Sequence, residues 1–246
     1  MRKGQVTVYV FIGILVLFIV GSIMYAQQLR SGAGIAQGIT YPPKVQEVRD
    51  LVEACVQKTV NEGLMVLGLQ GGYYQLPERV SAETALTSFA YWYYNGQAVV
   101  PSLEEVEDQL SLYVRDNVPA CAGVGEAVGL DIQAGRVAAE VMSQGDGVLV
   151  SVDYPLSMNV GGVTAQIRDP YMVGVPVRLQ KVYESARQIV NNTVNDPEYV
   201  DITYLAASGF DIEVTPMENG GLLYAILDRN SVVNNMPFQF VIGVDV

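Results

Sequence analysis

Histidine is absent from this chain of 246 residues, and cysteine occurs only twice. Without histidine the chain lacks the commonest general base and the commonest ligand for transition metals. This absence excludes Ser-His-Asp and Cys-His catalysis, and two cysteines are too few for a structural zinc site. We find no other catalytic, cofactor-binding or metal-binding pattern, so we predict a non-enzymatic protein that carries neither a cofactor nor a metal.

The first part of the chain lacks charge, since no charged residue lies between Lys3 and Arg30. Residues 6–25 are predominantly apolar on every side of a helical wheel, whereas a soluble helix keeps a polar face. Because a helix rises about 1.5 Å per residue, about 20 such residues cross the roughly 30 Å core of a bilayer. We therefore predict that residues 1–30 form a transmembrane anchor, with residues 6–25 in contact with the lipid bilayer.

The flanking basic residues favour one orientation of this helix. Arg2 and Lys3 precede it and only Arg30 follows closely, which predicts a single-pass cell-membrane protein with a cytoplasmic N-terminus and residues 31–246 extracytoplasmic. A cleaved secretory signal is the alternative, but its apolar core is usually about 7–15 residues long and ends in a small-x-small site. The run here is longer, and Met24 stands where such a site needs a small residue.

A short motif precedes the apolar run. Residues 3–7 read KGQVT, which resembles the class III signals of archaeal type IV pilin-like proteins, in which cleavage follows a glycine preceded by basic residues. The resemblance implies processing between Gly4 and Gln5, so that a new N-terminal glutamine begins an apolar helix. This chain departs from the family at Tyr9, where the family carries a glutamate that is thought to help subunits register in the filament core.

A second resemblance covers more of the chain. Cys55, the sequence LQGGY at residues 69–73 and the signal at Gln5 together resemble a group of uncharacterised single-pass membrane proteins from archaea. The group has no assigned activity. The resemblance therefore implies a membrane location and brings no reaction, ligand or site residue with it.

Basic residues are scarce in the rest of the chain. We interpret the Gly-rich residues 31–42 as a stalk, and residues 43–246 then contain 11 basic and 26 acidic residues, a net charge of −15. Nucleic-acid binding depends on neutralising phosphates, so we predict no nucleic-acid partner. The same charge keeps the domain away from an anionic bilayer surface. An acidic domain exposed to the exterior is the interpretation that fits this composition.

Two cysteines, Cys55 and Cys121, remain to be explained. In an oxidising exterior compartment, an even number of cysteines favours a disulfide. This disulfide would close a loop of about 65 residues and stabilise the fold by roughly 3–5 kcal/mol in the chain-entropy view. Two buried thiols are the alternative interpretation.

Residues 43–121 show the pattern of a helix-hairpin-helix α+β unit. Apolar residues recur every three or four positions over residues 43–69, which predicts a helix that ends in the glycines following it. Farther on, Asn95-Gly96 lies between two β-prone runs. This dipeptide predicts a hairpin, because both residues of the turn need a positive φ.

A second helix is predicted after the hairpin. Ser102 and Glu105 have the spacing of a capping box, and we expect the helix to stop near Pro119. Four acidic residues crowd its first two turns, where the helix dipole favours negative charge. We therefore interpret these acids as structural and not as an acid–base pair.

An aromatic run in the hairpin is the one candidate ligand surface. If residues 88–94 form a strand, Trp92 and Tyr94 share one of its faces. Exposed on that face, they would make an aromatic platform for a glycan or a peptide. Packed under a helix or against a neighbouring strand, they would belong to the core.

Residues 136–246 are predicted to form an antiparallel sheet domain of order βββ-α-βββ, with helices on one face. We expect a short further helix to start at Asp196-Pro197 and a turn at residues 228–230. The predicted strands are 137–142, 148–158, 163–177, 211–215, 222–227 and 238–246, and the predicted helix between them is 178–194. The proline at position 170 predicts that the third strand is bent or lies at an edge.

Three functional hypotheses follow. The first is a membrane-anchored extracytoplasmic domain with an envelope or partner-binding role, which binds a second copy of itself or another envelope protein. The alternative is a type IV pilin-like subunit processed at Gly4-Gln5. The third is a carboxylate-based hydrolase of envelope glycans, which needs two facing acids in a cleft near Trp92. Asn191 begins an N-x-T sequon and is a candidate glycosylation site outside the cell.

Overall fold

The computed structural model describes residues 41–78, 80–83, 88–123, 130–196, 199–218 and 220–245. Nearly all of these residues belong to one compact unit, Pro43–Val246. The predicted anchor, the Gly4-Gln5 bond and the predicted stalk up to residue 40 lie outside the described residues. Of the helices that are described, none is both long enough and apolar enough to cross a bilayer.

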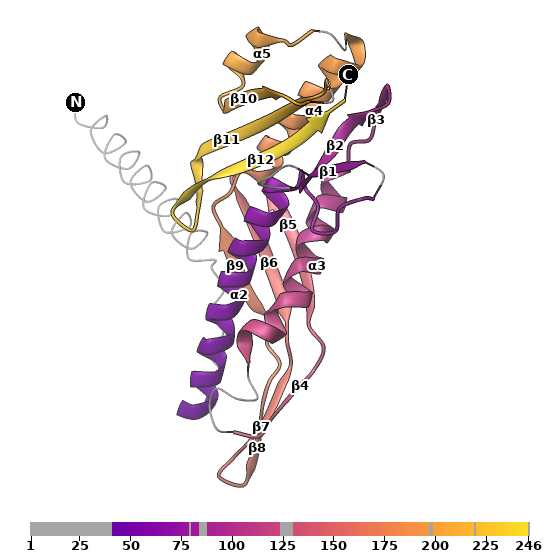
Figure 1. Ribbon diagram of the computed structural model, residues 1–246. Helices are drawn as coiled ribbons and strands as arrows, with labels where there is room; N and C mark the ends of the chain where they lie inside the picture. The colour runs from indigo at the N-terminus through magenta and orange to yellow at the C-terminus, as the bar shows by residue number, and fades with distance from the viewer. Residues whose placement is uncertain are drawn as a thin grey trace, which may run out of the picture. The chain divides into compact units, whose positions relative to one another are not determined.

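The described residues form an α+β fold, as predicted (Figure 1). Its helices are α2 (Pro43–Leu69), α3 (Leu103–Ala122), α4 (Leu179–Asn195) and α5 (Ile202–Ala207). The strands of the first half are β1 (Ser81–Glu83), β2 (Ser88–Tyr94), β3 (Gln97–Ala98), β4 (Ile132–Ala134), β5 (Ala138–Gln144) and β6 (Gly147–Asp153). The remaining strands are β7 (Leu156–Val160), β8 (Val163–Ile167), β9 (Tyr171–Val175), β10 (Asp211–Pro216), β11 (Leu222–Val233) and β12 (Met236–Val244).

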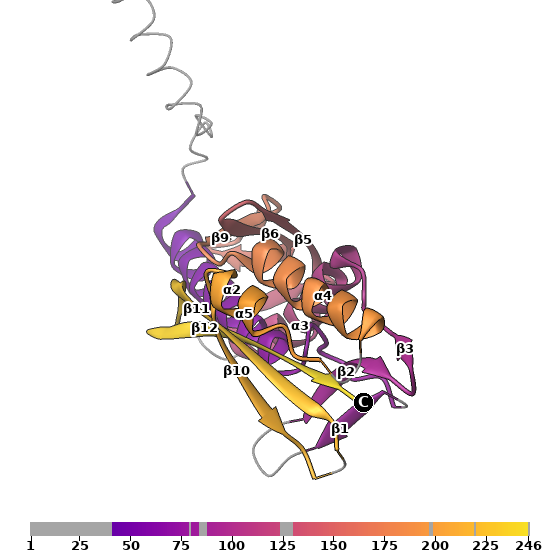
Figure 2. The same cartoon turned by 90° about the horizontal axis from the view of Figure 1, so that it is seen from above.

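Helices α2 and α3 pack against each other and lie between two sheets (Figure 2). Gly63 allows their close approach, because a Cβ atom at this position would lie 2.7 Å from the Leu110 side chain. Cys55 and Cys121 form a disulfide that joins the two helices, with Cα atoms 5.7 Å apart, which confirms the predicted pairing. The helix pair is thus held by packing and by a covalent bond.

The predicted helix signals are confirmed at three of the four ends of α2 and α3. Pro43 is the first residue of α2, and two glycines with φ of 69° and 91° follow its C-terminus. Ser102 and Glu105 form the predicted capping box at the start of α3. The fourth end differs, since α3 continues through Pro119 to Ala122 and ends at a Gly C-cap.

One face of α2 packs on a mixed sheet of order β1-β2-β12-β11-β10, in which β3 pairs with β2. The predicted hairpin is present, since Asn95 and Gly96 both have positive φ between β2 and β3. Strand β12 pairs in parallel with β2, with Gly243 opposite Tyr91. This pairing joins the predicted units 43–121 and 136–246, and their described residues belong to one compact unit.

Strands β4 to β9 form a bent three-stranded ribbon and not half of a single sheet. Its upper part is the sheet β5-β6-β9, called here the meander sheet, and its lower part is the distal sheet β4-β7-β8. The predicted strand 148–158 breaks at Pro155, which has no N–H to donate to a neighbouring strand. Gly135 allows the bend, because a Cβ there would lie 2.6 Å from the Pro155 ring. The break before β9 falls at Pro170, where a bend was expected.

Two other predictions of local structure are wrong. Residues 228–230, expected to form a turn, lie within β11, where the register shifts between Asp228 and Val232. The chain turns instead at Asn234-Asn235, with φ of 50° and 64°. The short helix α5 begins at Ile202 behind the N-cap Asp201, whereas Asp196 caps the end of α4 and Pro197 lies outside the described residues. The predicted order of strands, then one long helix, then strands is otherwise present, with α4 in the predicted place.

The irregularity in β11 serves to hold the start of α4. Asp228 is buried there, and its carboxylate accepts hydrogen bonds from the Arg178 guanidinium, with Nε 2.9 Å from Oδ2, and from the Ser231 hydroxyl. Burial alone would raise the pKa of Asp228, but these bonds and one from the Asn230 N–H outweigh burial and lower it. Arg178 immediately precedes α4, so the ion pair fixes the helix to the mixed sheet.

We expect the stabilising effect of Asp228 to depend on pH. Its pKa in the folded chain is lowered, so its contribution is complete above the unfolded value of about 3.9 and is lost as the pH falls below it. At neutral pH, Asp228→Asn should lower the free energy of unfolding by about 3 kcal/mol, which is the low end of the range for breaking a buried ion pair. In urea unfolding, the difference in the free energy of unfolding between wild type and variant should become smaller from pH 5 to pH 3. A gap that stays constant would contradict this account, and the exposed Glu53→Gln serves as the control.

Candidate functional site

Trp92, one of the two residues of the predicted aromatic platform, is not on the surface. Trp92 is completely buried, with its ring edge-on to Tyr183 and Phe240 at centroid distances of 5.6 Å. Its indole N–H donates to the Gly71 carbonyl oxygen at 2.9 Å. Tyr94 is half-buried beside Tyr91. Trp92 therefore belongs to the core between α4 and the mixed sheet, and the alternative interpretation of this residue is the right one.

The other predicted site residues are placed as follows. Asn191 is exposed on α4, and its main-chain carbonyl oxygen accepts a hydrogen bond from the Asn195 side chain. The hydroxyl of the sequon, on Thr193, is buried and donates to Ile189 O at 3.2 Å. Gly4 and Gln5 lie outside the described residues. In the part of the chain that is described, no group of three or more Cys, Asp or Glu side chains is arranged to hold a metal ion.

The meander sheet has an outer face that is unusually apolar. Met142, Leu149 and Met172 lie on its three strands and are 51%, 45% and 53% exposed. An antiparallel sheet with one buried face normally carries polar side chains on the other. Single exposed apolar residues are ordinary, but a contiguous group marks an interaction surface.

The strand register brings these three residues together. Met142 of β5 lies opposite Leu149 of β6, and Leu149 lies opposite Gly174 of β9. Met172 is two pairs farther along, opposite Ser151, and therefore lies on the same face. Gly174 lowers the surface beside Leu149, because a Cβ atom built there would meet nothing within 4 Å. The outer face therefore carries an apolar patch of three side chains, with a depression at Gly174 and with Ser151 and Glu140 beside it.

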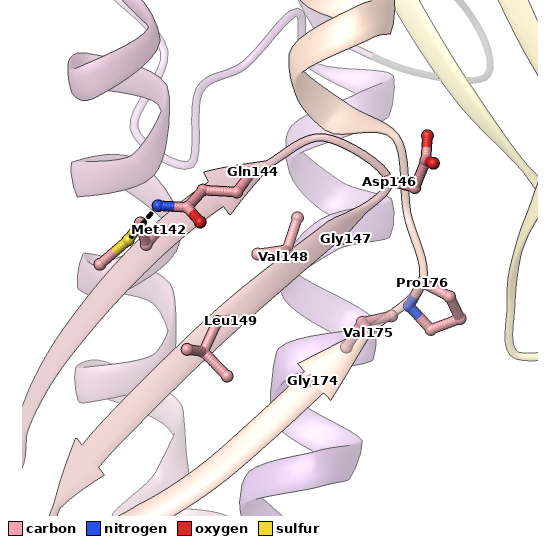
Figure 3. Close-up of a pocket in the computed structure, with 9 residues that line it drawn as sticks. All are labelled: Met142, Gln144, Asp146, Gly147, Val148, Leu149, Gly174, Val175 and Pro176. Carbon is pink, nitrogen blue, oxygen red and sulfur yellow. Dashed lines mark hydrogen bonds between the residues drawn. The ribbon is translucent and has the colours of Figure 1, made fainter. Parts of the chain in front are cut away.

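The helices that the structure describes cover the inner face of the meander sheet. The alternate residues Val148, Val150 and Val152 of β6 are buried, as are those of β9. Helix α3 packs along β5, and α2 packs near β9. Figure 3 views the sheet from the outer side, with the helices behind the strands.

Two adjoining hollows lie on this outer face. The first, of about 480 Å³, runs across the strand ends near the turn at Asp146 to Gly174 and Pro176 (Figure 3). The second, of about 780 Å³, extends along the strands toward α3. Met142 and Leu149 line both hollows, so the two adjoin at these side chains and are described together as one groove. We call this the outer groove.

The flank of the outer groove is acidic. Glu104, Glu107 and Asp108 of α3 line it together with Glu140 of β5. Its described lining residues include no lysine or arginine. The acids of α3 were predicted to be structural because they occupy the first turns of the helix, and the structure also places three of them beside an apolar surface.

Two polar contacts hold the walls of the groove in place. The Glu107 carboxylate accepts hydrogen bonds from the N–H and the hydroxyl of Ser143, with the N–H at 2.7 Å. These bonds occupy part of the edge of β5 and fix it to α3. At the turn, Lys181 of α4 donates to Asp146 at 2.6 Å, and this bond lowers the pKa of Asp146. The site is thus built on fixed elements.

The sequence does contain a signal for this face, namely apolar residues at strand positions where alternation predicts polar ones. In β6 the buried residues Val148, Val150 and Val152 alternate with Leu149, Ser151 and Asp153. Leu149 is apolar in the row that should be polar, and Met172 breaks the same rule in β9. Alternation alone could have identified these two residues. It could not have shown that they face each other across paired strands.

Comparison of the chain with protein-family models, with curated proteins and with solved structures finds no match. The chemistry of the outer groove therefore has to be argued from its own geometry.

Two neighbouring substitutions test which face of β6 is structural. Leu149→Thr on the outer face should change the free energy of unfolding by no more than about 0.5 kcal/mol. Val150→Thr on the inner face should lower it by about 1–3 kcal/mol, because the new hydroxyl is buried without a planned partner. Urea unfolding monitored by circular dichroism measures both. Equal losses for the two variants would show that the outer face is also part of the core.

Proposed function

We propose that this chain is a membrane-anchored extracytoplasmic domain that binds a protein partner and has no enzymatic role. Residues 6–25 would contact the lipid bilayer, the N-terminus would be cytoplasmic, and residues 31–246 would lie outside the membrane. The observation that carries the binding role is the group of exposed apolar side chains on the outer face of the meander sheet, whose inner face packs against helices.

The disulfide supports the exterior location. Stable disulfides persist in oxidising compartments outside the cytosol, and Cys55 and Cys121 are bonded between two core helices. No free cysteine remains in the described part of the chain. The acidic composition of residues 43–246 agrees with a domain that stays in solution above the bilayer surface.

The pilin-like subunit is the alternative, and the N-terminus distinguishes the two. The membrane-anchored protein keeps Met1, or at most loses only that residue, whereas the pilin-like subunit starts at Gln5. Intact mass of the mature protein decides between them. The third hypothesis, the glycan hydrolase, stays a prediction, because it needs two facing acids in a cleft near Trp92; the burial of Trp92 does not support it.

The topology can be tested with thiols in whole cells. We expect Val163→Cys, at a position 69% exposed on β8, to react with a membrane-impermeant maleimide added to intact cells. Arg2→Cys should react only after permeabilisation, because it would be cytoplasmic. The unmodified chain is the control and should not react, since Cys55 and Cys121 are bonded. Labelling of Val163→Cys only after permeabilisation would contradict the proposed location.

A further inference from the structure

We propose that the outer groove binds a cationic amphipathic helix of a partner protein. This inference rests on the binding role proposed above and specifies the chemistry of the partner. The partner helix would lay apolar side chains on Met142, Leu149 and Met172 and direct lysine or arginine side chains toward the acids of α3 and β5.

The layer structure of the fold favours a helix as the occupant. Stable domains cover each apolar face of a sheet with another layer. Helices α2 and α3 cover the inner face of the meander sheet, and the outer face carries apolar residues without a layer in the described part of the chain. A helix on the outer face would complete a helix-sheet-helix arrangement.

The length of strands β5 and β6 agrees with a helix of four turns. Strands β5 and β6 have 7 residues each, and at about 3.3 Å per residue they are roughly 23 Å long. A helix of about 15 residues has the same length. Apolar residues at intervals of three and four would all face the sheet. Methionine is flexible and polarisable, so Met142 and Met172 can adapt to side chains of different shape.

Charge selects the partner. Glu104, Glu107, Asp108 and Glu140 line the groove, and basic residues of a partner would find four carboxylates along one flank. A second copy of this chain is a poor occupant, because residues 43–246 carry a net charge of −15 and two acidic flanks would approach each other. An acidic or phosphorylated partner is disfavoured for the same reason. The complementary partner is therefore basic.

The binding test uses the full chain in nanodiscs of zwitterionic lipid. The probe is a fluorescent peptide of about 15 residues, with leucines on one helical face and lysines on the other. Its counterparts carry glutamate in place of lysine, or the same residues in scrambled order. Empty nanodiscs give the background from lipid. We expect the lysine peptide to bind the wild-type chain above this background, and the two counterparts to bind at least about tenfold more weakly.

Two variants of the groove and two matched controls locate the binding. The double variant Asp108→Lys/Glu140→Lys should weaken binding of the lysine peptide about tenfold. The control Glu53→Lys/Glu213→Lys makes the same change of net charge at exposed positions elsewhere and should leave binding unchanged. Gly174→Trp should block the floor of the groove and weaken binding to a similar degree. Val163→Trp, on the distal sheet, should not.

Several results would overturn the proposal. If the charge variants of the groove and of the control positions lose peptide binding equally, the lysine peptide is attracted to any acidic protein and not to the groove. Binding of the glutamate peptide, or concentration-dependent dimerisation that Gly174→Trp abolishes while no peptide binds, would show a different occupant. The topology test is independent of all of these. If the lysine peptide does not bind but thiol labelling gives the expected topology, the partner chemistry alone is refuted. If the peptide binds but labelling gives the opposite topology, the location alone is refuted.

Discussion

The packing of α2 against α3, closed by the Cys55–Cys121 disulfide, is the interaction on which the rest of the fold depends. One sheet packs on each side of this helix pair (Figure 2). The disulfide joins residues 66 positions apart, which in the chain-entropy view stabilises the fold by about 4 kcal/mol. That is a large part of the total stability of an ordinary domain, about 5–15 kcal/mol. Loss of the helix pair would therefore expose the inner faces of both sheets at once.

The same helix pair explains why the outer groove exists. Once α2 and α3 cover the inner face of the meander sheet, its edge strand β5 lies along α3, and the acids in the first turns of α3 border the opposite face of the sheet. Those acids satisfy the helix dipole and form one flank of the groove. Glu107 does both and also binds the edge of β5 through Ser143. One short segment thus has a structural role and also borders the proposed binding site.

Local signals in the sequence predicted local structure well. The capping box at Ser102, the Asn95-Gly96 hairpin and the stripe of α2 depend on residues close in sequence, and all were confirmed. The parallel pairing of β2 with β12 joins residues about 150 positions apart and has no local signal. The burial of Trp92 follows from that pairing and from α4, so its exposure was not predictable. The apolar Leu149 was visible in the pattern, but its partners across the strands were not.

The central claim is that residues 43–246 fold in an oxidising compartment around a bonded α2–α3 pair. The most direct measurement is the state of Cys55 and Cys121 in protein extracted from cells in acid, alkylated in denaturant without reductant, and analysed by peptide mass mapping. The account predicts no alkylation of either residue before reduction, and one peptide pair linked through Cys55 and Cys121. Full alkylation of both residues without reductant would contradict the exterior location and the bonded helix pair together.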